Sequence, residues 1–486
     1  MRFRLLVATV PFLPMLLGAC ASAPSARAPG MPSNEAYAPT AAGYAAKGAD
    51  STSTASADPG SEAMPMPAPT TPPPSGAVAH STPPPAPPPP GLPPTSADRG
   101  GAGPGVATMS IMPPQPSGIK AGEWDDNANY REFQAWLRTE EGQAFHRVDV
   151  RDRRFVVVRD AQGRAVPRCR VTIADSAQHQ TSLTTTASGR AVLFPHAEGL
   201  AGKDLFATAS CEGATATATF SLGEPDGIVD LKLTTARTLP AVRTIDVAFI
   251  LDTTGSMAEE IASVKSTIQK VTTSLGKANV KVRIGLVAFK DRGDEYVTKV
   301  FPMTTDFDSF QREVAGIRAG GGGDTPESVN EGIHVALTKL DWQKDSIGRY
   351  AFLVGDAPPH LDYPQDFDYV ADMKDAAHRG IQIFTIAASG MDDLGQVVFR
   401  QVAQYTNATN MFVLRGGAGP QSTGAGDPKS SCGGTQTAFA SGQLDGLILG
   451  KINQEMKALD RDPMRIAGLG RDENAKPCNE RLIARD

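Results

Sequence analysis

The sequence has 486 residues, enough for about two or three domains with buried cores. Charged residues make up 21% of the chain, and the formal net charge is −6. This mildly acidic balance, without a basic stripe, argues against nucleic acid as a partner.

The first residues, MRFRLLVATVPFLPMLLGACASAPS, are typical of an exported protein. After a basic start, the apolar run over 5–17 is too short to span a bilayer comfortably. The LLGAC that follows resembles the lipobox of bacterial lipoproteins, whose cysteine, here Cys20, is lipid-modified. The resemblance implies a signal peptide over 1–19 and an extracytoplasmic, lipid-anchored place in the cell envelope, with Ala21 favouring the outer membrane. An ordinary signal peptide cleaved nearby is the alternative.

Residues 20–121 are dominated by Ala, Pro, Ser, Gly and Thr, with TPPPAPPPPGLPP as the extreme case. Such a segment cannot bury enough apolar surface to offset its ordering entropy, so we expect a disordered tether. As a flexible coil, about 100 residues would average ~55 Å end to end. The tether would let a folded head work away from the membrane.

A short helical segment is expected over 122–146. Its large side chains repeat at helical spacing (Tyr130, Phe133, Trp136 and Leu137). We expect this helix to pack on the domain that follows.

Short strands separated by turn residues follow over 147–238, among them RFVVVRD, CRVTIAD, GRAVLFP and ATATFSL. This pattern predicts a small antiparallel β-sandwich. VVRDAQGRAVPRCRVTIAD resembles carboxypeptidase regulatory-like and related Ig-like modules, which implies a spacer or accessory binding domain.

Four cysteines remain once the first is lipid-modified, and an even number in an exported chain suggests two disulfides. Proximity in sequence favours Cys169–Cys211 and Cys432–Cys478, although four cysteines allow three pairings. The second bond would fold the short polar tail, 461–486, back on the protein.

Strands alternate with helices over 244–460. IDVAFIL is a nearly continuous apolar strand, and VRIGLVAF, YVTKVFP, RYAFLVGD, IQIFTIAAS and NMFVLR follow at intervals filled by helical patterns, the last near 444–459. Strands buried on both faces and joined by helices predict an α/β domain with a doubly wound, mostly parallel sheet.

Oxygen-bearing side chains follow two of these strands. Asp252 ends IDVAFIL and Asp356 ends RYAFLVGD, and Thr254 and Ser256 come directly after the first. Ligands in such sheets bind beyond the carboxyl ends of the strands, where the winding reverses. If the two strands are neighbours at that point, all four side chains face one crevice.

A third loop, AGGGGDTPES, adds Asp324 and Thr325 after four glycines. Carboxylates and hydroxyls without His or Cys suit a hard divalent cation, Mg²⁺ in the first place, with Mn²⁺ or Ca²⁺ as alternatives. The structural interpretation is that such residues cap helices and that glycine runs form loops. Three such loops at corresponding positions of the predicted sheet favour a metal site over this structural interpretation.

With these motifs in place, residues 244–460 resemble a von Willebrand factor type A domain. DTTGS matches the DxSxS metal-ion-dependent adhesion site (MIDAS), with Thr254 in place of the first serine, and GGGDTPE and GDAPPH match the second and third loops. The combination most resembles the branch found in alpha-kinase-associated and bacterial type A domains. That branch has an Asp in the second loop, so Asp324 and Thr325 both stay open as the contact there.

The resemblance implies that Thr254 and Ser256 bind the cation directly, and that Asp252 and Asp356 bind it directly or through water. An open position on the ion would take a carboxylate from a protein partner, and the last helix can move with the metal's environment. The predicted function is an envelope-anchored, divalent-metal-dependent protein-binding or adhesion module that is not an enzyme.

Two other functions stay open. DTTGS also resembles the DKTGT of aspartyl-phosphate pumps, which would make Asp252 the nucleophile of a Mg²⁺-dependent phosphatase, but Thr254 stands where the second acid is expected. The second of these functions is that of a non-adhesive envelope scaffold. Structural roles are expected for the RGD at Arg292–Asp294 and for the lone His360.

Overall fold

The computed structural model describes residues 119–138, 147–413 apart from 225, 279, 324 and 389, then 440–466 and 469. The predicted signal peptide and nearly all of the tether lie outside these residues, as do Cys20, Asp324, Cys432 and Cys478. Within the described part of the chain, no helix has the length and apolar character needed to cross a membrane.

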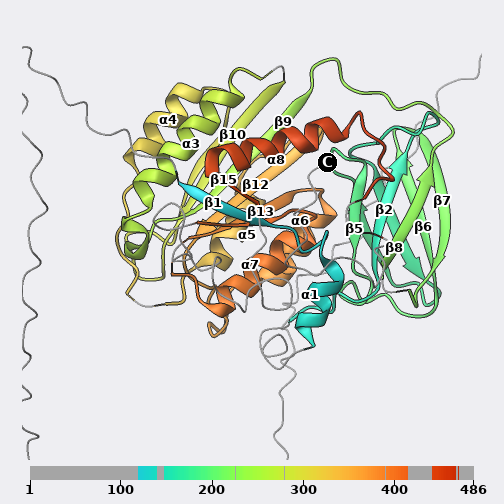
Figure 1. Cartoon of the computed structure of the whole chain (residues 1–486), viewed down its shortest axis with the longest axis horizontal. Coiled ribbons are helices and arrows are strands. Elements are labelled where there is room, and N and C mark those ends of the chain that lie inside the picture. The colour runs from blue at the N-terminus through green and yellow to red at the C-terminus, as the bar shows by residue number, and fades with distance from the viewer. Residues whose placement is uncertain are drawn as a thin grey trace, which may run out of the picture. The chain divides into compact units, whose positions relative to one another are not determined.

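An eight-stranded sheet forms the centre of the α/β domain (Figure 1). Its strands, in order across the sheet, are β11 (Thr298–Thr304), β10 (Lys281–Phe289), β9 (Thr244–Asp252), β12 (Gly348–Gly355), β13 (Gln382–Ala387), β14 (Asn410–Val413), β1 (Lys120–Trp124) and β15 (Ala440–Gln443). The strands from β10 to β14 run parallel, whereas β11 is antiparallel to β10 and β1 is antiparallel to both of its neighbours. The predicted doubly wound, mostly parallel sheet is confirmed.

Helices cover both faces of this sheet (Figure 1). One face carries α3 (Ile261–Leu275), α4 (Phe307–Gly316) and α8 (Leu444–Ala458), and the other carries α5 (Val329–Lys339), α6 (Tyr369–His378) and α7 (Asp393–Tyr405). Because apolar side chains are covered on both sides, every residue of β12 is buried, as are all but the first of β9.

The winding of the sheet reverses between β9 and β12, which lie side by side with Leu251 opposite Val354. The chain passes from β9 to β10 on one side and later returns to β12 on the other side. Asp252 is the last residue of β9 and Asp356 directly follows β12. The two carboxylates therefore sit at the switch point, as the sequence predicted.

The β-sandwich consists of a three-stranded and a four-stranded sheet. The first contains β5 (Arg190–Leu193), β2 (Arg153–Arg159) and β8 (Asp226–Lys232), and the second contains β4 (Gln180–Thr184), β3 (Arg170–Asp175), β6 (Asp204–Cys211) and β7 (Ala214–Ser221). Burial alternates strictly along β6, because only one face of its sheet meets the core. The antiparallel pattern has one departure, the parallel pair of β2 with β8, the first and last strands of the domain.

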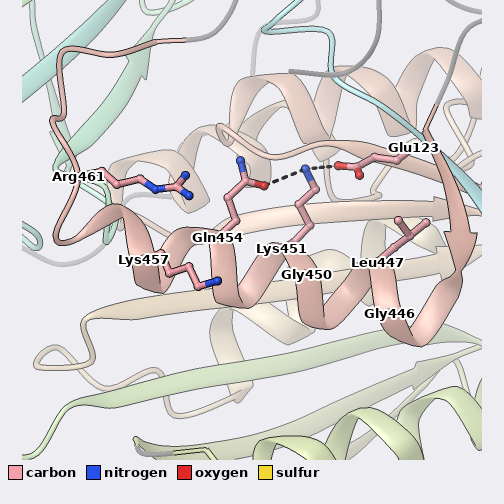
Figure 2. Close-up of a pocket in the computed structure, with 8 residues that line it drawn as sticks. All are labelled: Glu123, Gly446, Leu447, Gly450, Lys451, Gln454, Lys457 and Arg461. Atoms are coloured by element: carbon pink, nitrogen blue, oxygen red, sulfur yellow. Dashed lines mark hydrogen bonds and ion pairs between the residues drawn. The ribbon is translucent and has the colours of Figure 1, made fainter. Parts of the chain in front are cut away.

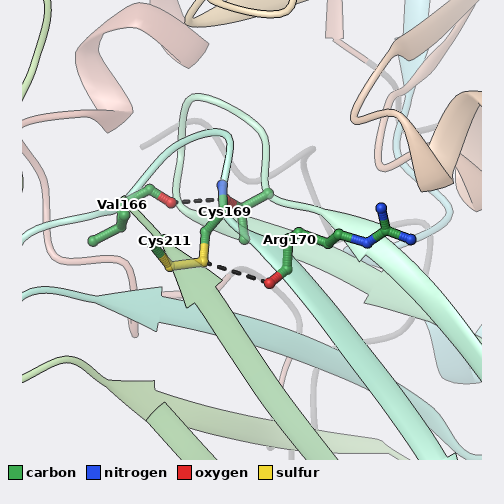
Figure 3. The surroundings of a disulfide bond; sticks show 5 residues. Val166, Cys169, Arg170 and Cys211 are labelled. Carbon is green, nitrogen blue, oxygen red and sulfur yellow. Dashed lines mark hydrogen bonds between the residues drawn. A yellow bond between two sulfur atoms is a disulfide. The ribbon is translucent and has the colours of Figure 1, made fainter. Parts of the chain in front are cut away.

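A disulfide joins Cys169 to Cys211 in the sandwich (Figure 3). The antiparallel register of β3 and β6 places Arg170 opposite Ser210, so the two cysteines are the next pair along the ladder. The Cys169 N–H also donates to Thr185 Oγ1 at 2.9 Å. This bond confirms the predicted Cys169–Cys211 pairing, and the predicted Cys432–Cys478 bond lies outside the described residues.

β1 is a strand that the sequence did not predict. Its first two residues, Lys120 and Ala121, were expected to belong to the disordered tether, and the others to the helical segment, so both expectations are wrong here. β1 lies between β14 and β15, and the Leu444 N–H at the start of α8 donates to Ile119 O at 2.8 Å. Lys451 of α8 forms an ion pair with Glu123 of β1 on the wall of a groove of about 240 Å³ (Figure 2). The predicted helix follows as α1 (Tyr130–Leu137).

Candidate metal centre

Four of the predicted site residues form a hydrogen-bonded row of oxygen atoms at the switch point. Asp252 Oδ1 accepts from the N–H of Thr254 at 2.9 Å and from its Oγ1 at 2.7 Å. Thr254 Oγ1 lies 3.1 Å from Ser256 Oγ, which donates to Asp356 Oδ1 at 3.0 Å. Asp252 and Thr254 are fully buried, whereas Ser256 is exposed, so the row opens to solvent at the serine.

The glycine-rich loop lies directly against this row. The Gly255 N–H donates to Gly321 O at 2.8 Å, and the Gly320 N–H donates to Thr253 O at 3.1 Å. Gly322 has φ +67°, and a Cβ there would lie 2.7 Å from Glu327 Oε1 and 3.0 Å from Thr254 Cβ. Glycine is therefore required at this position by both backbone conformation and space.

The glycine-rich loop also contains Asp324 and Thr325, the two metal ligands predicted from it. Asp324 lies outside the described residues. Thr325 is exposed, and within the described part of the chain no hydrogen bond joins it to the row of Asp252, Thr254, Ser256 and Asp356. The structure thus brings four of the six predicted ligands together and does not decide the contact of the second loop.

Glu327 is a site residue that the sequence analysis missed. Its side chain is 2% exposed, and its Oε1 approaches the space next to Thr254 that a side chain on Gly322 would fill. Its backbone is fixed beside the third loop, since its N–H donates to Pro358 O and its carbonyl accepts from the His360 N–H. Glu327 therefore adds a third buried carboxylate to Asp252 and Asp356.

These carboxylates raise one another's pKa values because they are buried together. Burial, and then the charge of Asp356, raises the pKa of Asp252 to about 7. Burial, and then the charge of Asp252, raises the pKa of Glu327 to about 8, and burial also raises the pKa of Asp356. The buried ammonium of Lys290 nearby donates to the carbonyls of Thr253 and Gly320. Ionising these carboxylates together is therefore unfavourable in the folded protein unless a cation stabilises their charge.

The donors present fit a hard divalent cation. Among the described residues, Asp252 Oδ2 and Glu327 Oε2 are buried and have no hydrogen-bond partner. Buried oxygen atoms of this kind are costly unless they bind a proton, a donor or a metal ion. In the same part of the chain no three His, Cys, Asp or Glu side chains are arranged to hold a metal by themselves, so the shell would include the hydroxyls of Thr254 and Ser256.

The RGD tripeptide and His360 make contacts within the protein. Arg292 donates to Glu331 Oε1 at 2.9 and 2.7 Å, and the Asp294 carboxylate accepts from the Gly322 N–H at 2.8 Å. His360 Nδ1 lies 2.8 Å from Asp362 Oδ1. These contacts favour the structural roles expected from the sequence.

Comparisons with known proteins identify the α/β domain. Residues 246–389 match the von Willebrand factor A domain family. A protein of Acanthamoeba polyphaga mimivirus named as an ariadne-like RING finger protein is 31% identical over 116 residues, which are 24% of this chain and 11% of that protein. The alpha-protein kinase vwkA of Dictyostelium discoideum is 32% identical over 136 residues, 27% of this chain and 21% of the kinase. The matches therefore span a small part of these relatives.

Among solved structures, an aerotolerance-related membrane protein from Bacteroides fragilis has 16% sequence identity and a TM-score of 0.26, and the match covers 37% of this chain and 94% of that one. This TM-score is too low to support a statement about function. The family match, the relatives and the doubly wound sheet agree with one another. The chain therefore contains a von Willebrand factor A domain.

Proposed function

We propose that this chain is an envelope-anchored protein-binding module that acts through a divalent cation, Mg²⁺ in the first place. Von Willebrand factor A domains commonly bind a divalent cation and mediate protein–protein interactions. Thr254, Ser256, Asp252 and Asp356 would hold the ion, with Glu327 as an additional carboxylate. The bound ion would act as a Lewis acid toward a carboxylate oxygen of the partner. Lipidation at Cys20 would anchor the module, in the outer membrane by preference.

One observation carries this proposal: the buried carboxylates of Asp252, Asp356 and Glu327 lie with two hydroxyls at the switch point, and among the described residues Asp252 Oδ2 and Glu327 Oε2 have no hydrogen-bond partner. The nearby Asp294 carboxylate, by contrast, accepts from the N–H groups of Asp291 and Gly322. A cation would satisfy the two unpartnered oxygen atoms together. Ser256, at the solvent end of the row, would leave the ion accessible to a partner.

The cation is tested by isothermal titration calorimetry of the purified chain with MgCl₂ and MnCl₂. We expect one ion per chain, and at least a tenfold weaker affinity in Ser256→Ala. Ser266→Ala, on the middle of α3, is the matched control and should bind as the wild type does. A wild-type chain that binds neither ion, or a Ser256→Ala variant with unchanged affinity, contradicts the site.

The partner is tested by quantitative crosslinking in envelope extracts. A binding module should lose the same partner in EDTA and in the Ser256→Ala variant and keep it in Ser266→Ala. Identical partners under all conditions would instead support the non-adhesive scaffold.

We propose binding rather than enzymatic activity. The Asp252 side chain is fully buried, and its Oδ1 is held by two groups of Thr254, which is unfavourable for a nucleophile. The phosphatase alternative predicts Mg²⁺-dependent hydrolysis of p-nitrophenyl phosphate that Asp252→Ala abolishes. Such turnover would overturn the proposal.

A further inference from the structure

We propose that Leu361 and Phe367 form an apolar contact surface next to the metal centre, for a protein partner whose metal-binding acidic residue is accompanied by a bulky apolar residue and by a lysine or arginine. This inference rests on the proposed function, because it adds the partner's chemistry to the same site. We call the segment 360–367 the rim loop.

The rim loop begins at the metal centre. Asp356 lies at its approach, and residue 359 forms a parallel bridge with Glu327. The His360 N–H then donates to Glu327 O at 3.3 Å. Leu361 is the next residue, so its position is fixed one residue away from the backbone of a site carboxylate.

A single side chain holds the two ends of the rim loop together. Asn330 Nδ2 donates to His360 O at 2.7 Å and to Asp366 Oδ2 at 2.9 Å. Leu361 follows the first of these anchor residues and Phe367 follows the second. The two apolar side chains therefore emerge from neighbouring points of one closed loop.

The interior of the rim loop is ordered by its own contacts. The Tyr363 ring stacks on His360 at 3.8 Å between centroids, and the guanidinium of Arg292 lies 4.2 Å from the Tyr363 ring centroid. Arg292 also donates to Asp366 Oδ1 at 2.9 Å. Since a preformed loop loses little entropy on binding, these contacts favour recognition by this segment.

The apolar side chains of the rim loop are exposed although its polar groups are engaged. Leu361 is 43% exposed and Phe367 is 44% exposed. Among the described residues, the other large apolar side chains with comparable exposure are Phe206, Val242 and Val300, which lie on the sandwich, on the connection to β9 and on the edge strand β11. The Phe367 ring stacks with one face on His334 of α5, at 3.7 Å between centroids. Two such exposed side chains thus lie within seven residues of a loop that begins beside the metal centre, and an exposed apolar surface of this kind indicates binding.

The charge around these two side chains defines the rest of the partner. The carboxylate of Asp362, next to Leu361, is 73% exposed and lies 2.8 Å from His360 Nδ1. That of Asp368, next to Phe367, is 49% exposed and pairs with Arg147 at 3.7 Å. An acidic residue of the partner is acceptable at the cation but is repelled at these positions. A lysine or arginine beside the apolar residue complements them.

The test uses a yeast-displayed library of random peptides, selected on the full-length protein in MnCl₂. Enriched peptides are expected to carry an Asp or Glu, a bulky apolar residue and a Lys or Arg. Synthetic copies should bind Leu361→Ser and Phe367→Ser roughly threefold to tenfold more weakly than the wild type, as expected for half of a large apolar side chain at ~25 cal/mol per Å².

Two exposed apolar residues elsewhere provide matched controls. Val300→Ser and Phe206→Ser should bind the peptides as the wild type does, and all four variants should keep the wild-type affinity for Mn²⁺. Binding that is lost in EDTA but unchanged in Leu361→Ser and Phe367→Ser would overturn the contact surface alone. Binding that persists in EDTA, or after the peptide's acidic residue is replaced by its amide, would overturn the proposed function. A selection that enriches no peptide counts against both.

Discussion

Replacing Glu327 by glutamine removes one charge from the metal centre and keeps the shape of the side chain. Burial, and then the charge of Asp252, raises the pKa of Glu327 from 4.5 to about 8. The folded, metal-free protein therefore binds this proton more tightly than the unfolded chain does. Its stability should fall as the pH rises from 4.5 to about 8. Above that range the ionised group should cost roughly 2–4 kcal/mol, less than the full ~1.4 kcal/mol per pH unit because solvent screens part of the charge.

The assay is urea unfolding of the wild type and Glu327→Gln in EDTA at pH 4.5 and pH 8.5. We expect similar stabilities at pH 4.5, where the wild-type side chain is protonated in the folded state and about half protonated in the unfolded chain. At pH 8.5 we expect the variant to be the more stable. Added Mg²⁺ at a hundredfold excess over its Kd should stabilise the wild type by about 2.7 kcal/mol. The variant should gain less, because it lacks one ligand charge.

Glu331→Gln is the control, since Glu331 is also a partly buried glutamate of this region but pairs with Arg292. Burial raises the pKa of Glu331 although Arg292 lowers it, so this variant is the control for the metal and not for stability: it should respond to Mg²⁺ as the wild type does. If Glu327→Gln is no more stable than the wild type at pH 8.5 in EDTA, or keeps the full Mg²⁺ response, Glu327 does not belong to the charge cluster.

Three further predictions concern other parts of the chain. Gly322→Ala should destabilise the fold by about 1–3 kcal/mol and weaken Mn²⁺ binding in calorimetry, whereas Gly316→Ala, where a Cβ meets open space, should change stability by about 1 kcal/mol or less. A double Cys169→Ser, Cys211→Ser variant should lose about 4 kcal/mol in urea unfolding, since the bond closes a loop with a sequence separation of 42 residues. Cys20→Ser should abolish labelling by a palmitate analogue in a bacterial host and release the protein from the membrane fraction; unchanged labelling would contradict lipidation at Cys20.

The α/β fold could be predicted because each of its buried strands is marked by a short stretch of the sequence itself. IDVAFIL and RYAFLVGD are continuous apolar runs, and burial of both faces of a parallel sheet is the physical cause of such runs. β1 could not be predicted in this way. KAGEW has one large apolar residue and no alternation, and its pairing with β14 joins segments at opposite ends of the domain. Only tertiary packing makes this segment a strand.

The row of oxygen atoms could be predicted because its residues directly follow two strands that the fold must bring to one edge. Glu327 was missed for a local reason. It directly precedes Ser328, the N-cap of α5, so its position is also typical of an acidic residue at the start of a helix. The DTPE sequence, which contains Glu327, was the available signal for a site residue. The burial of the Glu327 side chain against Gly322 and Thr254 could not be predicted from it, because this burial depends on the meeting of three loops.

The charge cluster links the stability of the fold to the occupancy of the centre. Asp252, Asp356 and Glu327 each have a raised pKa, so ionising all three destabilises the metal-free protein. A cation that binds only the folded state recovers this free energy, and by linkage its affinity rises as the protons leave. The backbone of the centre is fixed by contacts within the protein, namely the paired strands β9 and β12 and the bonds of Gly255 and Glu327 to neighbouring loops. The sheet thus keeps the carboxylates together against their repulsion, which is the condition for a preorganised cation site.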